Sequence, residues 1–206
     1  FGLAPSSTTP IDLNLEHRLV LYVAFIAPVV ITLIFGKYDY DHRRFVLLYM
    51  STAGMISYNY GYTFATFLQP TSWPLHLCNT AMYIIPICLY FKLEKVFYFT
   101  LFINVLGAFF AMAMPNYSET INYMQEDFVE FWLNHYYAFF MPILCISLRI
   151  YERPKMKQFL YSLMGFGAYF LLVLFFNAWC SNYGDVDFFF LNSDFIAEKV
   201  GTWAED

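Results

Sequence analysis

Charged residues are scarce in this chain: they make up 13% of its 206 residues, while hydrophobic residues make up 60%. A soluble domain carries about 25% charged residues, so this composition excludes an ordinary soluble protein and indicates an integral membrane protein. No carboxylate or arginine stands in the middle of an apolar stretch, which disfavours an ion or proton transporter. The few charges are also mostly acidic, with a net charge of -5, so nucleic acid is not an expected partner.

The short alternating segments of a transmembrane barrel are missing as well. The apolar runs are continuous and reach the length of about 20 residues that a membrane-crossing helix needs. The sequence therefore predicts an all-α, polytopic transmembrane helical bundle that forms a single membrane domain over residues 1–206. The six predicted spans cover residues 17–36, 43–67, 74–91, 95–114, 128–149 and 158–180.

The basic residues predict how these spans are oriented. Nine of the 11 Lys and Arg fall in loops 37–44, 92–95 and 149–157. Cytoplasmic loops carry an excess of basic residues, so these three loops are expected on the cytoplasmic side and the N-terminus on the exoplasmic side. The acidic and aromatic tail 181–206 is too short and too charged to cross the membrane, so it is expected on the exoplasmic side. The sequence does not indicate which cellular membrane holds the protein.

Polar, titratable side chains stand near the outer ends of two predicted spans. Pro74 suits the first turn of the third span, so Cys78 lies about four residues, or ~6 Å, inside it. His135 lies about seven residues, or ~10 Å, into the fifth span. Polar groups within a membrane usually face the bundle interior, so one exoplasmic-side polar pocket is predicted. Its other expected members are His76, Asn79, Asn134, Asn177 and His17.

Helical geometry divides the pair that lies closest in sequence. Residues two apart point about 200° away from each other on a regular helix. His76 and Cys78 are therefore not expected to project into one pocket. Simpler roles stay open for these groups: Cys78 as a small buried apolar residue or in a disulfide with Cys180, and His135 in a hydrogen bond to Asn177 or a tyrosine.

Three stretches, 73–86, 104–115 and 132–142, resemble the YwaF-type family of bacterial integral membrane proteins and its eukaryotic relative, a transmembrane phospholipid (ether-lipid) acyltransferase. Most specific are Pro-Leu-His-Leu-Cys-Asn at 74–79 and Asn-His-Tyr-Tyr at 134–137, and Asn182-Tyr183 adds a weaker match. The resemblance implies a cysteine and a histidine that support acyl transfer between phospholipids, with no cofactor. Cys78 and His135 are the matching positions.

The family resemblance departs from this chain at its end. Those relatives usually carry one more apolar span after the exoplasmic loop, whereas this sequence stops at Asp206. A seventh span is therefore either absent or outside the residues given.

The implied chemistry uses a thiolate at Cys78 that attacks a fatty-acyl ester to form a thioester. His135 would be the base for the thiol and then for the hydroxyl of an acceptor lysophospholipid. The amides of Asn79, Asn134 or Asn177 would orient His135 or donate a hydrogen bond to the oxyanion.

Two other classes of function use the same residues. Imidazole and thiolate suit zinc or copper, but the spacing of His17, His76, Cys78 and His135 matches no recognised metal motif, so no metal is predicted. The alternative without catalysis is a lipid-binding or scaffold subunit, whose partners are phospholipids and other membrane subunits. The aromatic surplus of 25 Phe and 18 Tyr suits both lipid-facing and partner-facing helices.

Overall fold

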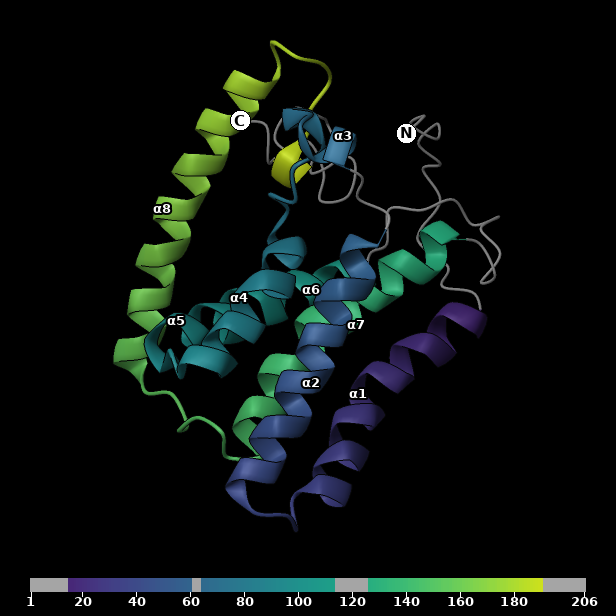
Figure 1. Ribbon diagram of the computed structural model, residues 1–206, viewed down its shortest axis with the longest axis vertical. Helices are drawn as coiled ribbons and strands as arrows, with labels where there is room; N and C mark the ends of the chain where they lie inside the picture. Colours follow the sequence, from purple (N-terminus) through teal and green to yellow (C-terminus); the bar gives the residue numbers. More distant parts are fainter. Residues whose placement is uncertain (1–14, 61–63, 114–125, 191–206) are drawn as a thin grey trace.

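The computed structural model describes residues 15–60, 64–113 and 126–190, and within these residues the regular structure is helical, without strands. This confirms the all-α class. The short turns are η1 (Pro70–Ser72), the π-helical η2 (Thr100–Asn104) and η3 (Phe188–Phe190). The α-helices are α1 (Leu15–Phe35), α2 (Tyr40–Asn59), α3 (Phe64–Phe67), α4 (Leu77–Phe91), α5 (Glu94–Phe99), α6 (Val105–Ala113), α7 (Glu126–Ser147) and α8 (Met156–Cys180) (Figure 1).

Three helical stretches among the described residues are both long enough and apolar enough to cross a membrane. They are His17–Phe35, Glu94–Ala113 and Met156–Cys180. The second is continuous through α5, η2 and α6. α4 is apolar but shorter, with 15 residues. These helices are those of a helical membrane protein, and the side of the membrane that each end faces stays a prediction.

α2 begins and ends earlier than the predicted span 43–67. It begins at Tyr40 because Asp39 caps it, with Oδ1 accepting the His42 N–H at 2.9 Å. This hydrogen bond holds the pKa of the Asp39 carboxyl below its usual range. The helix ends at Asn59, whose side-chain amide donates to the Met55 carbonyl at 2.7 Å and so competes with the backbone pattern.

The third predicted span also begins later than expected, at Leu77 and not at Pro74. His76 is the residue before the helix and has extended backbone angles. The Leu75 carbonyl accepts a hydrogen bond from the Tyr169 hydroxyl of α8 at 2.7 Å, which holds this segment out of the helix. The expected role of Pro74 in the first helical turn is therefore wrong.

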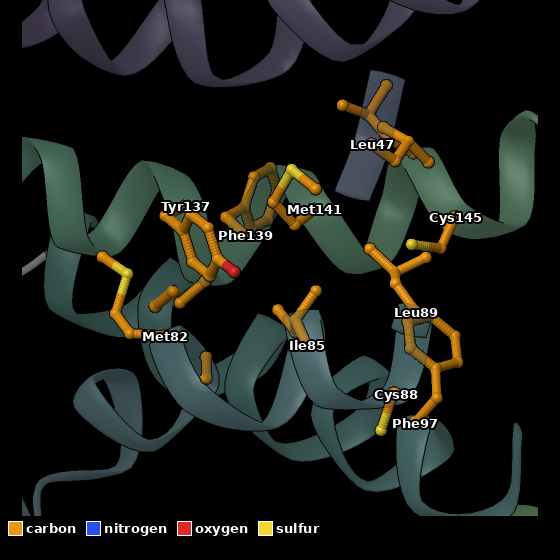
Figure 2. Packing of buried hydrophobic residues seen from close by; sticks show 14 of the residues in the cluster. Leu47, Met82, Ile85, Cys88, Leu89, Phe97, Tyr137, Phe139, Met141 and Cys145 are labelled. Atoms are coloured by element: carbon orange, nitrogen blue, oxygen red, sulfur yellow. The ribbon is translucent and has the colours of Figure 1, made fainter. Parts of the chain in front are cut away.

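α7 lies at the centre of the bundle and packs against α1, α2, α4 and α6. Figure 2 shows Met82 and Ile85 of α4 on the side facing Tyr137 and Met141 of α7. α2 approaches α7 closely at Gly54, where an added Cβ would lie 2.7 Å from the Tyr137 ring. α8 stands at the left edge of Figure 1 and contacts the bundle through α5 and η2.

Two adjacent arginines at the start of α2 join the ends of two other helices. Arg43 donates from Nη1 to the Leu148 carbonyl just after α7 at 2.6 Å. Arg44 donates from Nε and Nη2 to the Leu89 carbonyl of α4 at 3.0 and 2.7 Å, and from Nη2 to the Tyr90 carbonyl at 2.9 Å. Carbonyls in the last turn of a helix lack partners within the helix, so the guanidinium groups supply them. The start of α2 and the ends of α4 and α7 form what we call the basic end.

Replacing Arg44 with glutamine is expected to lower the free energy of unfolding by about 2 kcal/mol, since the charge-assisted hydrogen bonds to Leu89 and Tyr90 are lost. Thermal unfolding of the purified protein in detergent measures the change. Lys95→Gln is the control, because Lys95 also stands near this end but is exposed. Equal melting temperatures for the two variants would show that Arg44 does not hold α4.

Candidate functional site

Cys78 is the second residue of α4 and is buried, with 8% of its surface exposed. Its side chain lies in the main cluster of buried apolar residues, which draws on α2, α4 and α7. The thiol is free, and no hydrogen bond joins it to another described residue. Because α4 begins at Leu77, His76 lies outside the helix, so the predicted angle of 200° between His76 and Cys78 does not apply.

His135 lies on α7, and its hydrogen bond defines which ring nitrogen carries the proton. Nδ1 is 2.6 Å from the Phe131 carbonyl oxygen, and the Phe131 ring lies against the imidazole with 4.2 Å between centroids. A carbonyl only accepts, so Nδ1 must donate. The neutral ring then presents Nε2 with its lone pair, the form of histidine that removes protons.

A hydrogen bond between two amides joins α4 and α7 at the level of these residues. Asn134 donates from Nδ2 to Oδ1 of Asn79. Asn79 follows Cys78 in the chain, and Asn134 precedes His135. The structure thus brings together two of the expected pocket residues, and each adjoins one of the two residues expected to react.

His76 lies at the opening of α4 and faces the segment after α8. Its ring meets Phe188 edge to face, with 5.8 Å between centroids. The imidazole is also within electrostatic range of Asp187 and of His135. His76 therefore contacts the described part of the predicted exoplasmic tail at Phe188; residues 191–206 of that tail are outside the described residues.

Asn177 and His17 fasten other elements. Asn177 donates to the Phe188 carbonyl at 2.8 Å and accepts from the Phe188 N–H at 3.0 Å, so both atoms of its amide hold η3 against α8. His17 places Nε2 2.9 Å from the Met112 carbonyl, and its ring meets Trp132 edge to face at 5.0 Å. These contacts join α1 to α6 and α7. The two side chains were expected in the pocket by depth, and the hydrogen bonds described here join them to the backbone of Met112 and of Phe188.

Asn104 is a neighbour of the site that was not among the predicted pocket residues. It is fully buried in η2 and donates from Nδ2 to the Leu77 carbonyl and, at 3.4 Å, to the Thr80 hydroxyl. Within the described residues, Oδ1 of Asn104 and Oδ1 of Asn134 are buried and accept no hydrogen bond. Helical segments with a π turn are often found at functional sites. The available signal in the sequence was an asparagine inside the apolar span 95–114.

The disulfide and the metal site considered above are not seen among the described residues. Cys78 and Cys180 are both free, so they do not form the disulfide that was left open. Cys180 lies in a second apolar cluster with Val173, Val186 and Phe188. Among the described residues, no group of three or more His, Cys, Asp or Glu is placed to hold a metal ion.

A family model, that of the TMEM164 family, matches residues 13–203. The chain belongs to the TMEM164 family. No curated protein and no solved structure matches it. The TMEM164 match includes Cys78, Asn79, Asn134 and His135, so the whole candidate site lies within the family region.

Proposed function

We propose that this TMEM164-family protein is a phospholipid acyltransferase, related to the YwaF-type proteins, that moves fatty-acyl chains between phospholipids. The observation that carries the proposal is the hydrogen bond between Asn79 and Asn134. It joins the residue that follows Cys78 in α4 to the residue that precedes His135 in α7, and the two helices pack against each other. A thiol, an imidazole and an amide are the groups that covalent acyl transfer uses.

The first half of the reaction transfers the acyl chain to the protein. Nε2 of His135 takes the proton of the Cys78 thiol, and the thiolate attacks the ester carbonyl of the donor phospholipid. The tetrahedral intermediate releases a lysophospholipid oxygen, which takes the proton back from His135. The products of this half are a lysophospholipid and an acyl thioester on Cys78.

The second half reverses the roles with a different acceptor. Nε2 of His135 removes the proton from the hydroxyl of the acceptor lysophospholipid, and that oxygen attacks the thioester carbonyl. The carbon–sulfur bond breaks, and the thiolate of Cys78 takes the proton from His135. The acyl chain has then moved from one phospholipid to another without an outside energy source.

Asn79 is the group proposed to stabilise the negative oxygen of each tetrahedral intermediate. Its Oδ1 is held by Asn134, so its Nδ2 points away from that bond, and no described residue accepts from it. A preorganised amide N–H directed at a developing oxyanion is a recurrent stabilising device. Because Cys78 is buried, the donor ester reaches it only after the first turn of α4 and its neighbours separate.

Reconstitution into liposomes tests this function. The liposomes contain a phosphatidylcholine with one deuterated acyl chain and an unlabelled lysophosphatidylethanolamine, and mass spectrometry follows the label. The expected result is deuterated phosphatidylethanolamine that forms only with protein present. If no acceptor headgroup in a panel of lysophospholipids becomes labelled, the acyltransferase proposal is overturned.

A scaffold role is the second candidate, and the exposed face of α8 favours it. Within this helix only Ser162, Val173, Asn177 and Cys180 are buried, whereas large apolar residues such as Leu171 and Phe175 are exposed. Such a face suits lipid chains or another membrane subunit. The scaffold candidate predicts that Cys78→Ala leaves cellular phospholipid composition unchanged while the protein stays in an assembly.

A further inference from the structure

A groove of about 940 Å³ opens at the basic end of the bundle, far from Cys78. Its wall is apolar and comes from η2 and the last turns of α7, through Leu101, Ile143 and Ile146. Its rim includes Arg149 and Arg153, which are both exposed. Along α7, 12 residues separate His135 from Ser147, which also lines the groove, or ~18 Å, so the groove is distinct from the candidate catalytic site.

A second, smaller crevice adjoins this groove. It has a volume of about 200 Å³ and lies between α1 and α7, where Pro28 and Leu33 line it. Ile143 and Ser147 line both spaces, so the groove and the crevice lie on the two sides of one ridge of α7. Two apolar chains joined at one polar group would fit astride that ridge.

The charges at the rim point to an anionic ligand. Arg149 and Arg153 are both exposed, and neither forms an ion pair with another described residue. The acidic residue of the rim is Glu152, whose backbone N–H and carbonyl are held by Glu94 and Tyr98 at 3.2 and 3.1 Å. These bonds fix the rim in place. Arginine suits phosphate because its planar guanidinium donates two parallel hydrogen bonds.

The backbone of Arg149 adds a second observation. It has a φ of 58°, in the left-handed region, and the Ile150 N–H closes the end of α7 on the Cys145 carbonyl at 2.8 Å. Glycine is the residue that adopts this conformation without strain. Strained backbone of this kind clusters at functional and ligand-binding sites. Lys92, after α4, has the same conformation with a φ of 56° but does not line the groove.

We propose that this groove binds one anionic glycerophospholipid from the leaflet at the basic end. Arg149 and Arg153 hold its phosphate, one acyl chain lies along Leu101 and Ile146, and the other crosses Ile143 into the crevice beside α1. Basic pockets between transmembrane helices bind anionic headgroups in this manner. The inference does not depend on acyl transfer at Cys78, because it concerns a separate surface.

Native mass spectrometry of the full chain in a neutral detergent tests this site. The probes are phosphatidylglycerol and phosphatidylcholine with identical acyl chains, and inorganic phosphate alone. Wild type is expected to bind phosphatidylglycerol at least about tenfold more tightly than phosphatidylcholine, and to bind no inorganic phosphate. Arg149→Gly and Arg153→Gln should each weaken phosphatidylglycerol binding about fivefold.

Lys92→Gly is the matched control, because it removes a positive charge from the same left-handed position at the end of α4. Glycine fits the backbone at both positions, so both variants are expected to fold, and their melting temperatures check this. Equal binding of the two lipids by wild type would overturn the site. So would a loss in Arg149→Gly and Arg153→Gln no larger than that in Lys92→Gly, or displacement of phosphatidylglycerol by millimolar inorganic phosphate.

Discussion

Cys78→Ala is expected to reduce acyl transfer to the rate of protein-free liposomes, since the side chain proposed to form the thioester is gone. Removing a nucleophile typically costs several orders of magnitude, and we expect a loss of at least about 10³-fold. Deuterium transfer between the two phospholipids measures the rate. Cys180→Ala is the matched control, because it deletes another buried, free thiol that lies in the second apolar cluster.

His135→Gln extends this prediction to the base. Glutamine can still donate to the Phe131 carbonyl, but it cannot remove a proton, so the rate should fall about 10²- to 10⁴-fold. The melting temperatures of both variants should stay near that of wild type. Full transfer activity in both Cys78→Ala and His135→Gln would exclude the thioester mechanism and leave the scaffold candidate.

The class of fold was predictable from composition because a long apolar run has few physical solutions in a membrane. Every backbone polar group must be satisfied within the segment, so helices follow directly. The gathering of basic loops at one end was also predictable, and the contacts of Arg43 with Leu148 and of Arg44 with Leu89 bear out that gathering. Which side of the membrane this end faces stays a prediction from the positive-inside rule.

The ends of the helices were less predictable because tertiary hydrogen bonds decide them. Asn59 ends α2 while its Oδ1 accepts from Tyr83 of α4 at 2.7 Å, and Tyr169 of α8 holds Leu75 outside α4. Neither partner is near in sequence. Hydropathy depends on local composition alone. The predicted second span therefore extended beyond Asn59, and the predicted third span began at Pro74.

Of the candidate site, the sequence predicted that Asn79 and Asn134 lie at one level of the bundle, while the roles of Cys78 and His135 stay predictions. Depth along the spans placed Asn79 and Asn134 in one layer, and the hydrogen bond between them agrees with that placement. Depth along a span does not identify the partner of a side chain. The same criterion therefore also selected His17 and Asn177, whose hydrogen bonds to the backbone of Met112 and Phe188 join other elements. Asn104 was not predicted as a neighbour of the site, because the sequence predicts a regular helical span here and does not reveal the π turn η2.

Asn79→Asp is expected to slow acyl transfer about 10²- to 10³-fold at unchanged KM, because it removes the donor proposed to stabilise the oxyanion. The aspartate keeps an oxygen that accepts from Asn134, so the hydrogen bond between α4 and α7 is retained in both the wild type and the variant. Transfer rates over a range of lysophospholipid concentrations separate kcat from KM. Asn182→Ala, which removes an exposed amide on the same side of the bundle, should keep the wild-type rate.

Asn79→Ala completes the test because it removes the donor and the acceptor together. Interhelical hydrogen bonds in membranes contribute about 0.6 kcal/mol on average, so this variant should lose a little stability and the same amount of activity as Asn79→Asp. If the amide only joined the two helices, Asn79→Asp would retain its rate and Asn79→Ala alone would be impaired. The ratio of the transfer rates of Asn79→Asp and Asn79→Ala therefore shows whether Asn79 acts in the reaction or only in helix packing. The melting temperatures of the two variants measure the packing contribution separately.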